Sequence, residues 1–247
     1  MNIRFDGKRA LVTGAGRGIG RGIIKKLAEC GAECVAMSKT QENLDSLKNE
    51  VPGIQTVMVD LADWTATRNA LKDVGKIDLL VNNAAIVIMS PFLETTKEDL
   101  DKVFDINFKA VFNVSQIVAR SMVERGNGGA IVNVSSVTSR TAFMNMASYC
   151  SSKGALDSLT QVMATELGPH KIRVNSVHPH LVPLTDMGTS IVGSRPLEVL
   201  ESCLSRIPLN QFPDVEDVAN AVVFLLSDKA SNLNGIALPI DGGFEAN

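Results

Sequence analysis

The feature that most restricts the fold of this chain is an alternation between short apolar segments and longer segments with helical periodicity. Seven apolar runs rich in β-branched residues occur along the chain: RALVT, ECVAM, QTVMV, DLLVNN, AIVNVS, RVNSV and IALPI. They do not alternate with polar residues, which is typical of strands buried on both faces of a parallel sheet. The pattern therefore predicts an α/β fold, with a doubly wound, seven-stranded parallel sheet covered by helices on both faces.

The segments between these runs are long enough for crossover helices. No repeat, low-complexity tract or linker divides the 247 residues, so we expect a single domain over residues 1–247. The least regular part, residues 178–208, contains four prolines. Ligands of open α/β sheets bind beyond the carboxyl ends of the strands, so we expect a substrate loop there. The predicted helices cover residues 17–30, 41–50, 65–74, 98–124, 148–167 and 215–226.

Charge and composition exclude several classes of protein. The net charge is −3, without a long run of Lys and Arg, so we expect no nucleic-acid partner. The four cysteines form no C-x-x-C pair, and none has a histidine at ligand spacing, so we expect neither a metal nor a disulfide framework. No apolar stretch reaches about 18 residues and no apolar signal region opens the chain, so we expect no membrane span and a cytoplasmic location.

Glycines follow the first predicted strand in the segment TGAGRGIG, residues 13–20. The spacing is G-x-x-x-G-x-G, with Gly14, Gly18 and Gly20, because Ile19 stands where G-x-G-x-x-G would need its third glycine. Glycine permits a tight strand-to-helix turn and lets the backbone approach a pyrophosphate at the helix N-terminus. A flexible loop before a helix is the alternative, but the strand before and the helix after favour a dinucleotide site.

The end of the second predicted strand indicates which dinucleotide binds. An NAD enzyme places an acid there to bind the ribose hydroxyls, whereas this chain has MSKT, residues 37–40. Lys39 and, in the glycine turn, Arg17 can neutralise a 2′-phosphate, and Ser38 and Thr40 can donate hydroxyl hydrogen bonds to it. We therefore predict NADP(H). The alternative is that both cations are solvated surface residues.

Two further strand ends carry polar residues. Asp60 follows the third predicted strand, where its carboxylate could accept from the adenine amino group or, equally, cap the next helix. The segment VNNAA, residues 81–85, ends the fourth strand with asparagines and then small residues, which would let a nucleotide lie against the backbone. Plain turn chemistry is the alternative interpretation of the asparagines.

Tyr149 is the only tyrosine, and it stands four positions before Lys153 in a predicted helix. Residues at this spacing share a helix face, so a phenol and an ammonium can meet there. A cation about 4 Å from a phenolate is worth on the order of 4 kcal/mol at an effective dielectric of 20, equivalent to roughly three pKa units. The spacing therefore predicts a phenol of lowered pKa that can exchange a proton near neutral pH.

Together these motifs resemble the short-chain dehydrogenase/reductase family over nearly the whole chain. T-G-x-x-x-G-x-G, N-N-A-A, the serines of VNVSS and Y-x-x-x-K stand in the family's order and approximate spacing. The resemblance implies a Rossmann fold and hydride transfer with Tyr149 as acid, Lys153 on the nicotinamide ribose and Ser136, preferred over Ser135, on the carbonyl oxygen. It also implies that Asn107 fixes a water near Lys153. Without the family, Asn107 indicates a kink or a buried hydrogen bond.

Within the family, segments such as KTQENLDSL and ELGPHKIRVN resemble a group of tetrameric carbonyl reductases. This resemblance implies a homotetramer that reduces L-xylulose to xylitol and α-dicarbonyls such as diacetyl with NADPH. Met146 replaces a histidine usual in that group, and Thr185 lies six positions after Pro179 where five are usual. The predicted substrate contacts are Ser136, Phe143, Met146 and Tyr149. The predicted coenzyme contacts are Gly14, Arg17, Gly18, Ile19, Gly20, Ser38, Lys39, Thr40, Asp60, Leu61, Asn83, Ala84, Ala85, Tyr149, Lys153, Val182 and Thr185.

Other interpretations stay open at this point. The same scaffold supports reduction of a different carbonyl, such as a 3-oxoacyl thioester or a steroid, and a non-catalytic NADPH-binding module is a further alternative. Apolar residues on the predicted helix 148–167 fit packing on the sheet as well as a subunit interface. His170 is expected at the surface. His178 and His180 are expected at a pocket rim, where a structural role is favoured over a ligating one.

Overall fold

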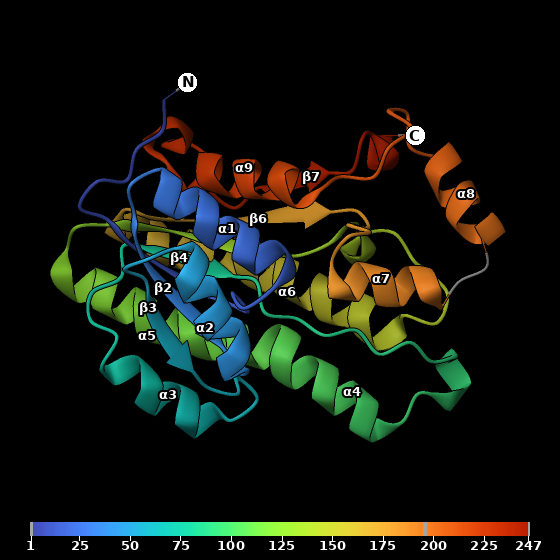
Figure 1. Cartoon of the computed structure of the whole chain (residues 1–247), viewed down its shortest axis with the longest axis horizontal. Helices are drawn as coiled ribbons and strands as arrows, with labels where there is room; N and C mark the ends of the chain where they lie inside the picture. Colours follow the sequence, from blue (N-terminus) through green and yellow to red (C-terminus); the bar gives the residue numbers. More distant parts are fainter. Residues whose placement is uncertain (1, 195–196, 247) are drawn as a thin grey trace.

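The computed structural model describes residues 2–194 and 197–246 of the chain. Within them, seven strands form one sheet in the order β3-β2-β1-β4-β5-β6-β7, and every neighbouring pair is parallel (Figure 1). The predicted doubly wound sheet is confirmed, and each predicted strand overlaps an observed one. The strands are β1 (Arg9–Thr13), β2 (Glu33–Ser38), β3 (Gln55–Met58), β4 (Leu79–Asn82), β5 (Gly129–Val134), β6 (Ile172–Pro179) and β7 (Ala237–Ile240).

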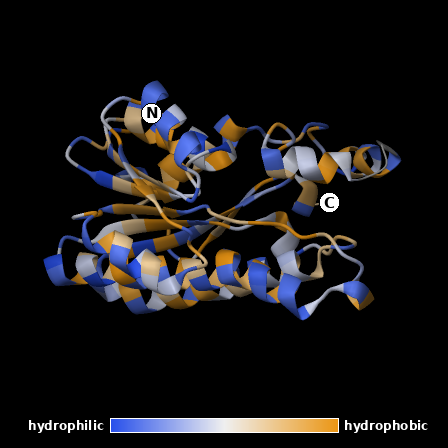
Figure 2. Cartoon of the chain, turned by 60° about the horizontal axis from the view of Figure 1, so that its bottom comes forward, coloured by the Kyte–Doolittle hydropathy of each residue, from blue (hydrophilic) through white to orange (hydrophobic). Residues whose placement is uncertain are grey.

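Helices cover both faces of the sheet, as Figure 2 shows. On one face lie α1 (Gly18–Glu29), α2 (Gln41–Glu50) and α9 (Val215–Leu226), whose apolar residues share one core with the strands. On the other face, α3 (Trp64–Lys72), α5 (Ala110–Arg125) and α6 (Ala147–Leu167) share a second core. No helix of the described residues is long and apolar enough to cross a membrane.

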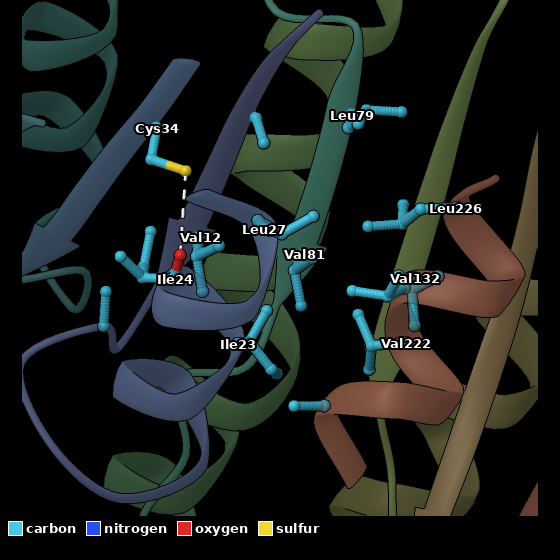
Figure 3. Packing of buried hydrophobic residues seen from close by; sticks show 14 of the residues in the cluster. Val12, Ile23, Ile24, Leu27, Cys34, Leu79, Val81, Val132, Val222 and Leu226 are labelled. Atoms are coloured by element: carbon cyan, nitrogen blue, oxygen red, sulfur yellow. Dashed lines mark hydrogen bonds between the residues drawn. The ribbon is translucent and has the colours of Figure 1, made fainter. Parts of the chain in front are cut away.

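Alternate side chains of one strand enter these two cores. In β1, Val12 packs into the core beneath α1 and α9, whereas its neighbour Leu11 packs into the core on the opposite face, and both are fully buried. Figure 3 shows Ile23 of α1 and Val222 of α9 close to β-strand residues of the first core. Full burial of each such aliphatic side chain contributes about 1.5–3 kcal/mol, so the sheet centre is well anchored and its strand ends are held in place.

The predicted helix 98–124 is continuous but not regular. It begins as α4 (Lys97–Phe104), passes through a π-helical turn at Asp105–Lys109, and continues as α5. A π turn inserts one extra residue into the helix, and such turns are frequent at functional sites. Asn107 lies inside this turn and is fully buried. Without the family resemblance the sequence indicated a kink or a buried hydrogen bond at Asn107, and the structure has both, the π turn and side-chain bonds to Ile86 and Ser152.

Residues 178–208 are more regular than predicted. His178 and Pro179 still belong to β6, and two helices follow, α7 (Asp186–Gly193) and α8 (Leu197–Ser205). The prediction of an irregular segment is therefore wrong. The prolines that the structure describes lie outside α7 and α8 and so do not interrupt either helix. The Thr185 side chain caps α7 by accepting from the Gly188 amide at 3.0 Å. Residues 195 and 196, which include Pro196, lie outside the described residues.

Candidate active site

One cavity of about 660 Å³ lies at the carboxyl ends of the strands. Its lining comes from the segments that follow β1, β2, β3, β4, β5 and β6, so residues far apart in sequence meet there. It spans the place between β1 and β4 where the strand order reverses, which is where doubly wound sheets bind their ligands. Every predicted coenzyme and substrate residue lines this cavity except Gly20, and Asn107 does not line it either.

The glycine turn has the geometry that close backbone approach requires. Gly14 has φ of +64°, and a Cβ there would lie 2.8 Å from the Cα of Ala84. A Cβ on Gly20 would lie 2.4 Å from the carbonyl oxygen of Gly14, so Gly20 packs α1 against the turn and does not face the cavity. Helix α1 begins at Gly18, and its N-cap residue Arg17 makes no side-chain cap. Its first amides are thus available to an anion.

Asn83 holds the glycine turn to the end of β4. Its Nδ2 donates to the carbonyl oxygens of Thr13 and Gly14, at 3.0 and 3.1 Å. The backbone amides of Asn83 and Ala84 both donate to Oγ1 of Thr13, at 3.0 and 3.2 Å. Asn82 instead donates to Asn133 and Ser115 beneath the sheet end. Asn83 thus uses its side chain to hold the glycine turn, whereas Asn82 ties β4 to β5 and α5, so the turn interpretation fits Asn83 only. A coenzyme contact of Asn83 stays a prediction.

The predicted 2′-phosphate residues surround one end of the cavity. Ser38, Lys39 and Thr40 line it, and Lys39 is exposed and makes no ion pair within residues 2–194 and 197–246. Arg17 is not simply solvated, because its Nη1 lies 2.5 Å from Oδ2 of Asp186, the first residue of α7. This ion pair joins the glycine turn to the segment after β6. The sequence analysis missed it because Asp186 is distant in sequence.

Asp60 and Leu61 line the cavity after β3. Asp60 does not cap α3, because Asp63 is the N-cap and accepts from the Ala66 amide at 2.8 Å. The Asp60 carboxylate accepts only the amide of Ala62, at 3.0 Å, among the described groups. The helix-cap alternative is therefore wrong, and the adenine contact stays a prediction.

The C-terminal end of β5 and the N-terminal part of α6 bring together the side chains of Ser136, Tyr149 and Lys153. All three are buried, with 7%, 7% and 2% of their surfaces exposed. Ser136 follows β5 and accepts from the Thr138 amide at 3.2 Å. The Nζ atom of Lys153 donates to the carbonyl oxygen of Val134 at 2.8 Å and lies 5.6 Å from the centroid of the Tyr149 ring. The lysine therefore points over the ring rather than to solvent.

In the chain without coenzyme the pKa of the phenol is not lowered as the spacing predicted, and the lowering that the family resemblance makes dependent on bound coenzyme stays a prediction. Burial raises the pKa of Tyr149 to about 12, and a hydrogen bond with Ser136 opposes this only in part. Burial also lowers the pKa of Lys153 to about 8, against the attraction of Asp157. The sequence-based prediction assumed a cation about 4 Å from the phenolate, but the ammonium of Lys153 donates to the carbonyl oxygen of Val134 and desolvation of the phenol dominates. The phenol is thus protonated at neutral pH and able to donate.

Asn107 uses its side chain for internal hydrogen bonds. Its Nδ2 donates to the carbonyl oxygen of Ile86 at 2.9 Å and to Oγ of Ser152 at 3.1 Å, and its Oδ1 accepts from the Ile86 amide at 2.9 Å. Ser152 in turn donates to the carbonyl oxygen of Tyr149 at 2.7 Å. Asn107 is therefore linked through Ser152 to α6, the helix that carries Tyr149 and Lys153, and the fixing of a water by Asn107 stays a prediction.

The other end of the cavity is mostly apolar. The cavity lining here includes Phe143 and Met146, whose contact with a substrate stays a prediction. Helices α7 and α8 add four lining residues that the sequence did not predict: Met187, Ile191, Leu200 and Cys203. The i, i+4 spacing of Met187 and Ile191, which are half-buried, was a usable signal for an apolar helix face. Val182 and Thr185 also line the cavity, but the Thr185 hydroxyl already donates to Val182 at 2.9 Å and caps α7. Their contact with the nicotinamide carboxamide stays a prediction.

Two of the three histidines lie deeper than predicted. His178 is fully buried, with Nε2 at 3.0 Å from Oγ of Ser176 and 3.1 Å from Oδ1 of Asp157, so the prediction of a rim position is wrong for it. His180 is also buried, although it does line the cavity. His170 is exposed at the end of α6, as predicted. No group of residues able to hold a metal ion occurs in the part of the chain that the structure describes.

A doubly wound parallel sheet, a glycine turn at its first strand end and a buried serine–tyrosine–lysine group in the same cavity define a Rossmann-type oxidoreductase. A family model described as enoyl-(acyl carrier protein) reductase matches residues 14–245. The chain belongs to the short-chain dehydrogenase/reductase family, as the resemblance in its sequence implied.

Individual relatives cover the whole chain. L-xylulose reductase of Bos taurus is 56% identical over 246 residues, which are 100% of both chains. The NADPH carbonyl reductase 2 of Sus scrofa is 53% identical over 246 residues, again 100% of both chains. The crystal structure of a gluconate 5-dehydrogenase from Burkholderia cenocepacia, in complex with NADP and tartrate, matches with a TM-score of 0.93 and 33% identity, covering 100% of this chain and 98% of that one.

Proposed function

We propose that this protein is an NADPH-dependent reductase of small carbonyl compounds, with L-xylulose and α-dicarbonyls such as diacetyl as its substrates. The observation that carries the proposal is the protonated, buried phenol of Tyr149 beside Ser136, in the same cavity as the glycine turn and Lys39. The names of the Bos taurus and Sus scrofa relatives support both the substrate class and the coenzyme.

The residues at the strand ends fit NADP(H). The N-terminus of α1 has no side-chain cap and adjoins the cavity, where the pyrophosphate would lie against the turn at Gly14 and Gly18. Lys39, with Ser38 and Thr40, would hold the 2′-phosphate. When bound, NADPH supplies the hydride that reduces the carbonyl carbon.

The chain's own groups act on the carbonyl oxygen. Ser136 donates a hydrogen bond as negative charge develops there, and Tyr149 transfers its phenolic proton to the same oxygen. Lys153 would hold the nicotinamide ribose, as the family resemblance implies, and its buried ammonium lies 5.6 Å from the centroid of the Tyr149 ring. In the reverse direction the deprotonated phenol would accept the proton of an alcohol.

A substrate panel tests the proposed function. We expect NADPH oxidation, followed by its absorbance, with L-xylulose and diacetyl but not with a 3-oxoacyl thioester or a steroid ketone. The apolar wall around Met146 would favour the diketone over the sugar, because sugar hydroxyls need polar partners. If the protein reduced the thioester or the steroid but neither L-xylulose nor diacetyl, the proposed substrate class would be wrong and the alternative class would take its place.

A charge reversal at Lys39 tests the coenzyme assignment. Lys39→Asp should lower the ratio of kcat/KM with NADPH to that with NADH by at least about tenfold, since a carboxylate repels the 2′-phosphate and accepts from the 2′-hydroxyl. Lys48→Asp is the matched control, because Lys48 is exposed on α2 and does not line the cavity. An unchanged ratio in Lys39→Asp would remove this lysine from coenzyme recognition.

We also propose that residues 1–247 form a single domain and that the protein works in the cytoplasm.

We further propose that the protein is a homotetramer. Phe112 on α5 is 40% exposed and Val162 on α6 is 48% exposed, which supports a subunit interface along these two helices. Light scattering of the purified protein should give a mass of four chains. A monomer at working concentration would contradict the assembly.

A further inference from the structure

The end of the described chain places a buried aromatic ring next to the substrate end of the cavity. Phe244 stands in a short 3-10 turn, Phe244–Ala246, that follows β7, and only 2% of its surface is exposed. Figure 1 shows this end of the chain beside α8. The cavity lining does not include Phe244, so its ring can affect a substrate only through the residues that it contacts.

Three segments around the substrate end contact this ring. Phe143, from the segment between β5 and α6, is stacked on Phe244 with ring centroids 6.1 Å apart and planes at 23°. His180, which follows β6, lies edge-on to Phe244 with ring centroids 4.6 Å apart. The guanidinium carbon of Arg206, which follows α8, lies 4.5 Å from the centroid of the Phe244 ring. Phe244 therefore joins three parts of the cavity wall that are separate in sequence.

The backbone that carries Phe244 is held firmly. The buried carboxylate of Asp241 accepts from the amides of Gly243 and Glu245, at 2.9 and 2.8 Å. The carboxylate of Glu245 lies 3.5 Å from Nη1 of Arg140, in the segment that leads to Phe143. These bonds fix the turn on both sides of Phe244, so its ring is a fixed support for the groups packed against it.

Phe143 is placed less firmly by its own segment. Residues 141–145 belong to no helix or strand, so the position of the Phe143 ring depends on the side chains around it. Phe143 is half-buried and lines the cavity, and its aromatic neighbours among the described residues are Phe244 and His180. Loss of the Phe244 ring would leave a space of ring size beside Phe143, into which Phe143 could withdraw from the cavity.

We propose that Phe244 is a positioning residue that holds the ring of Phe143 in the cavity wall and so limits the size of the α-dicarbonyl that the site accepts. This inference rests on the proposed function and on the predicted contact between Phe143 and the substrate. A compact substrate such as diacetyl fits beside the held ring, whereas a substituent of phenyl size needs the ring to withdraw.

The test compares two diketones of different size, diacetyl and acetylbenzoyl, in which a phenyl group replaces one methyl of diacetyl. Phe244→Ala should raise the ratio of kcat/KM for acetylbenzoyl to that for diacetyl by at least about tenfold, mainly through a lower KM for acetylbenzoyl. Phe244→Leu, which removes less volume and serves where the alanine variant does not fold, should give a smaller rise. The Kd of NADPH, from fluorescence titration, should stay the same in both variants.

A double-mutant cycle shows whether the effect passes through Phe143. Phe143→Ala should by itself raise the same ratio. Adding Phe244→Ala to Phe143→Ala should then change the ratio less than about twofold, because the ring that Phe244 holds is already gone. Phe5→Ala is the matched control, since Phe5 is 4% exposed, packs in the first core and does not line the cavity. It loses an equal ring and should leave the ratio unchanged. Melting temperatures compare the stability of all variants.

Three results would overturn the proposal while leaving the proposed function in place. An unchanged ratio in both Phe244→Ala and Phe244→Leu would mean that Phe244 only stabilises the fold. A full further rise on adding Phe244→Ala to Phe143→Ala would mean that the effect does not pass through Phe143. An equal rise in Phe5→Ala would assign the effect to general loosening. If the unaltered protein reduces neither diketone nor L-xylulose, the proposed function fails, and this inference fails with it.

Discussion

Tyr149→Phe is expected to lower the turnover number for carbonyl reduction by about 10²–10⁴-fold while NADPH binds as before. The substitution removes only the hydroxyl, so the ring that lies 5.6 Å from Nζ of Lys153 stays in place. The phenol is protonated at neutral pH because burial raises its pKa to about 12, and it is the proton source that the proposed reaction uses. Without it, the developing alkoxide must be protonated by solvent, from which this site is shielded.

Single-turnover decay of NADPH absorbance measures the chemical step, and fluorescence titration measures coenzyme binding. Ser151→Ala is the matched control, because it removes a hydroxyl from an exposed position of the same helix. Full turnover in Tyr149→Phe would show that another group is the acid. Intact NADPH binding without turnover in the unaltered protein would instead favour the non-catalytic module.

The sheet was predictable because its signal is local. A strand such as β1 is apolar at every position from Ala10 to Val12, since successive side chains enter two different cores. Similarly, the glycine spacing encodes the turn directly, since Gly14 needs a positive φ and Gly20 tolerates no Cβ. These requirements can be read from residue types without knowledge of distant neighbours.

The electrostatics were not predictable in the same way. The i, i+4 spacing correctly placed Tyr149 and Lys153 on one helix face, but the direction of the phenol's pKa depends on how far the tertiary structure excludes water. The bond from Lys153 to Val134 also crosses from α6 to β5. Likewise, the ion pair between Arg17 and Asp186 joins segments that only the fold brings together. Sequence spacing carries no information on such contacts.

The segment after β6 was mispredicted for a related reason. Its prolines suggested irregular chain, yet those that the structure describes lie outside α7 and α8, and the cap of α7 by Thr185 depends on only a short T-x-x-G pattern. The residues that α7 and α8 contribute to the cavity wall therefore escaped prediction, and this wall shapes the substrate end. Under the proposed function, the choice between a sugar and a diketone would depend on this wall, and so on the segment whose structure the sequence predicted least well.

Lys153→Met is expected to stabilise the fold while abolishing turnover. Lys153 is 2% exposed, and among the described residues its ammonium has one hydrogen-bond acceptor, the carbonyl oxygen of Val134. Burial lowers its pKa from 10.5 to about 8, which corresponds to a cost of ~3 kcal/mol for the charged form at pH 7. Methionine fills a similar volume without charge, so the free energy of unfolding should rise by about 1–3 kcal/mol after loss of the hydrogen bond to Val134.

The lowered pKa of Lys153 also predicts how the difference in unfolding free energy between the two proteins changes with pH. Between pH 8 and 10.5 the unfolded chain binds a proton on Lys153 that the folded chain has released, so the unfolding free energy of the unaltered protein rises with pH in that window. The advantage of Lys153→Met should thus be largest at pH 7 and shrink as the pH approaches 10.5. Urea unfolding of both proteins at pH 7 and 9.5 measures it, with Lys48→Met, at an exposed site, as the control.

Measuring the turnover of Lys153→Met beside its unfolding separates a structural role of Lys153 from a role in the reaction. If the buried ammonium is retained for catalysis, Lys153→Met must be more stable and yet lose at least about 10²-fold in turnover, because the group that would hold the nicotinamide ribose is gone. A variant that is less stable at pH 7 would mean that the bond to Val134 outweighs desolvation, and Lys153 would then be a structural residue first. A variant that is more stable and fully active would remove the lysine from the reaction altogether.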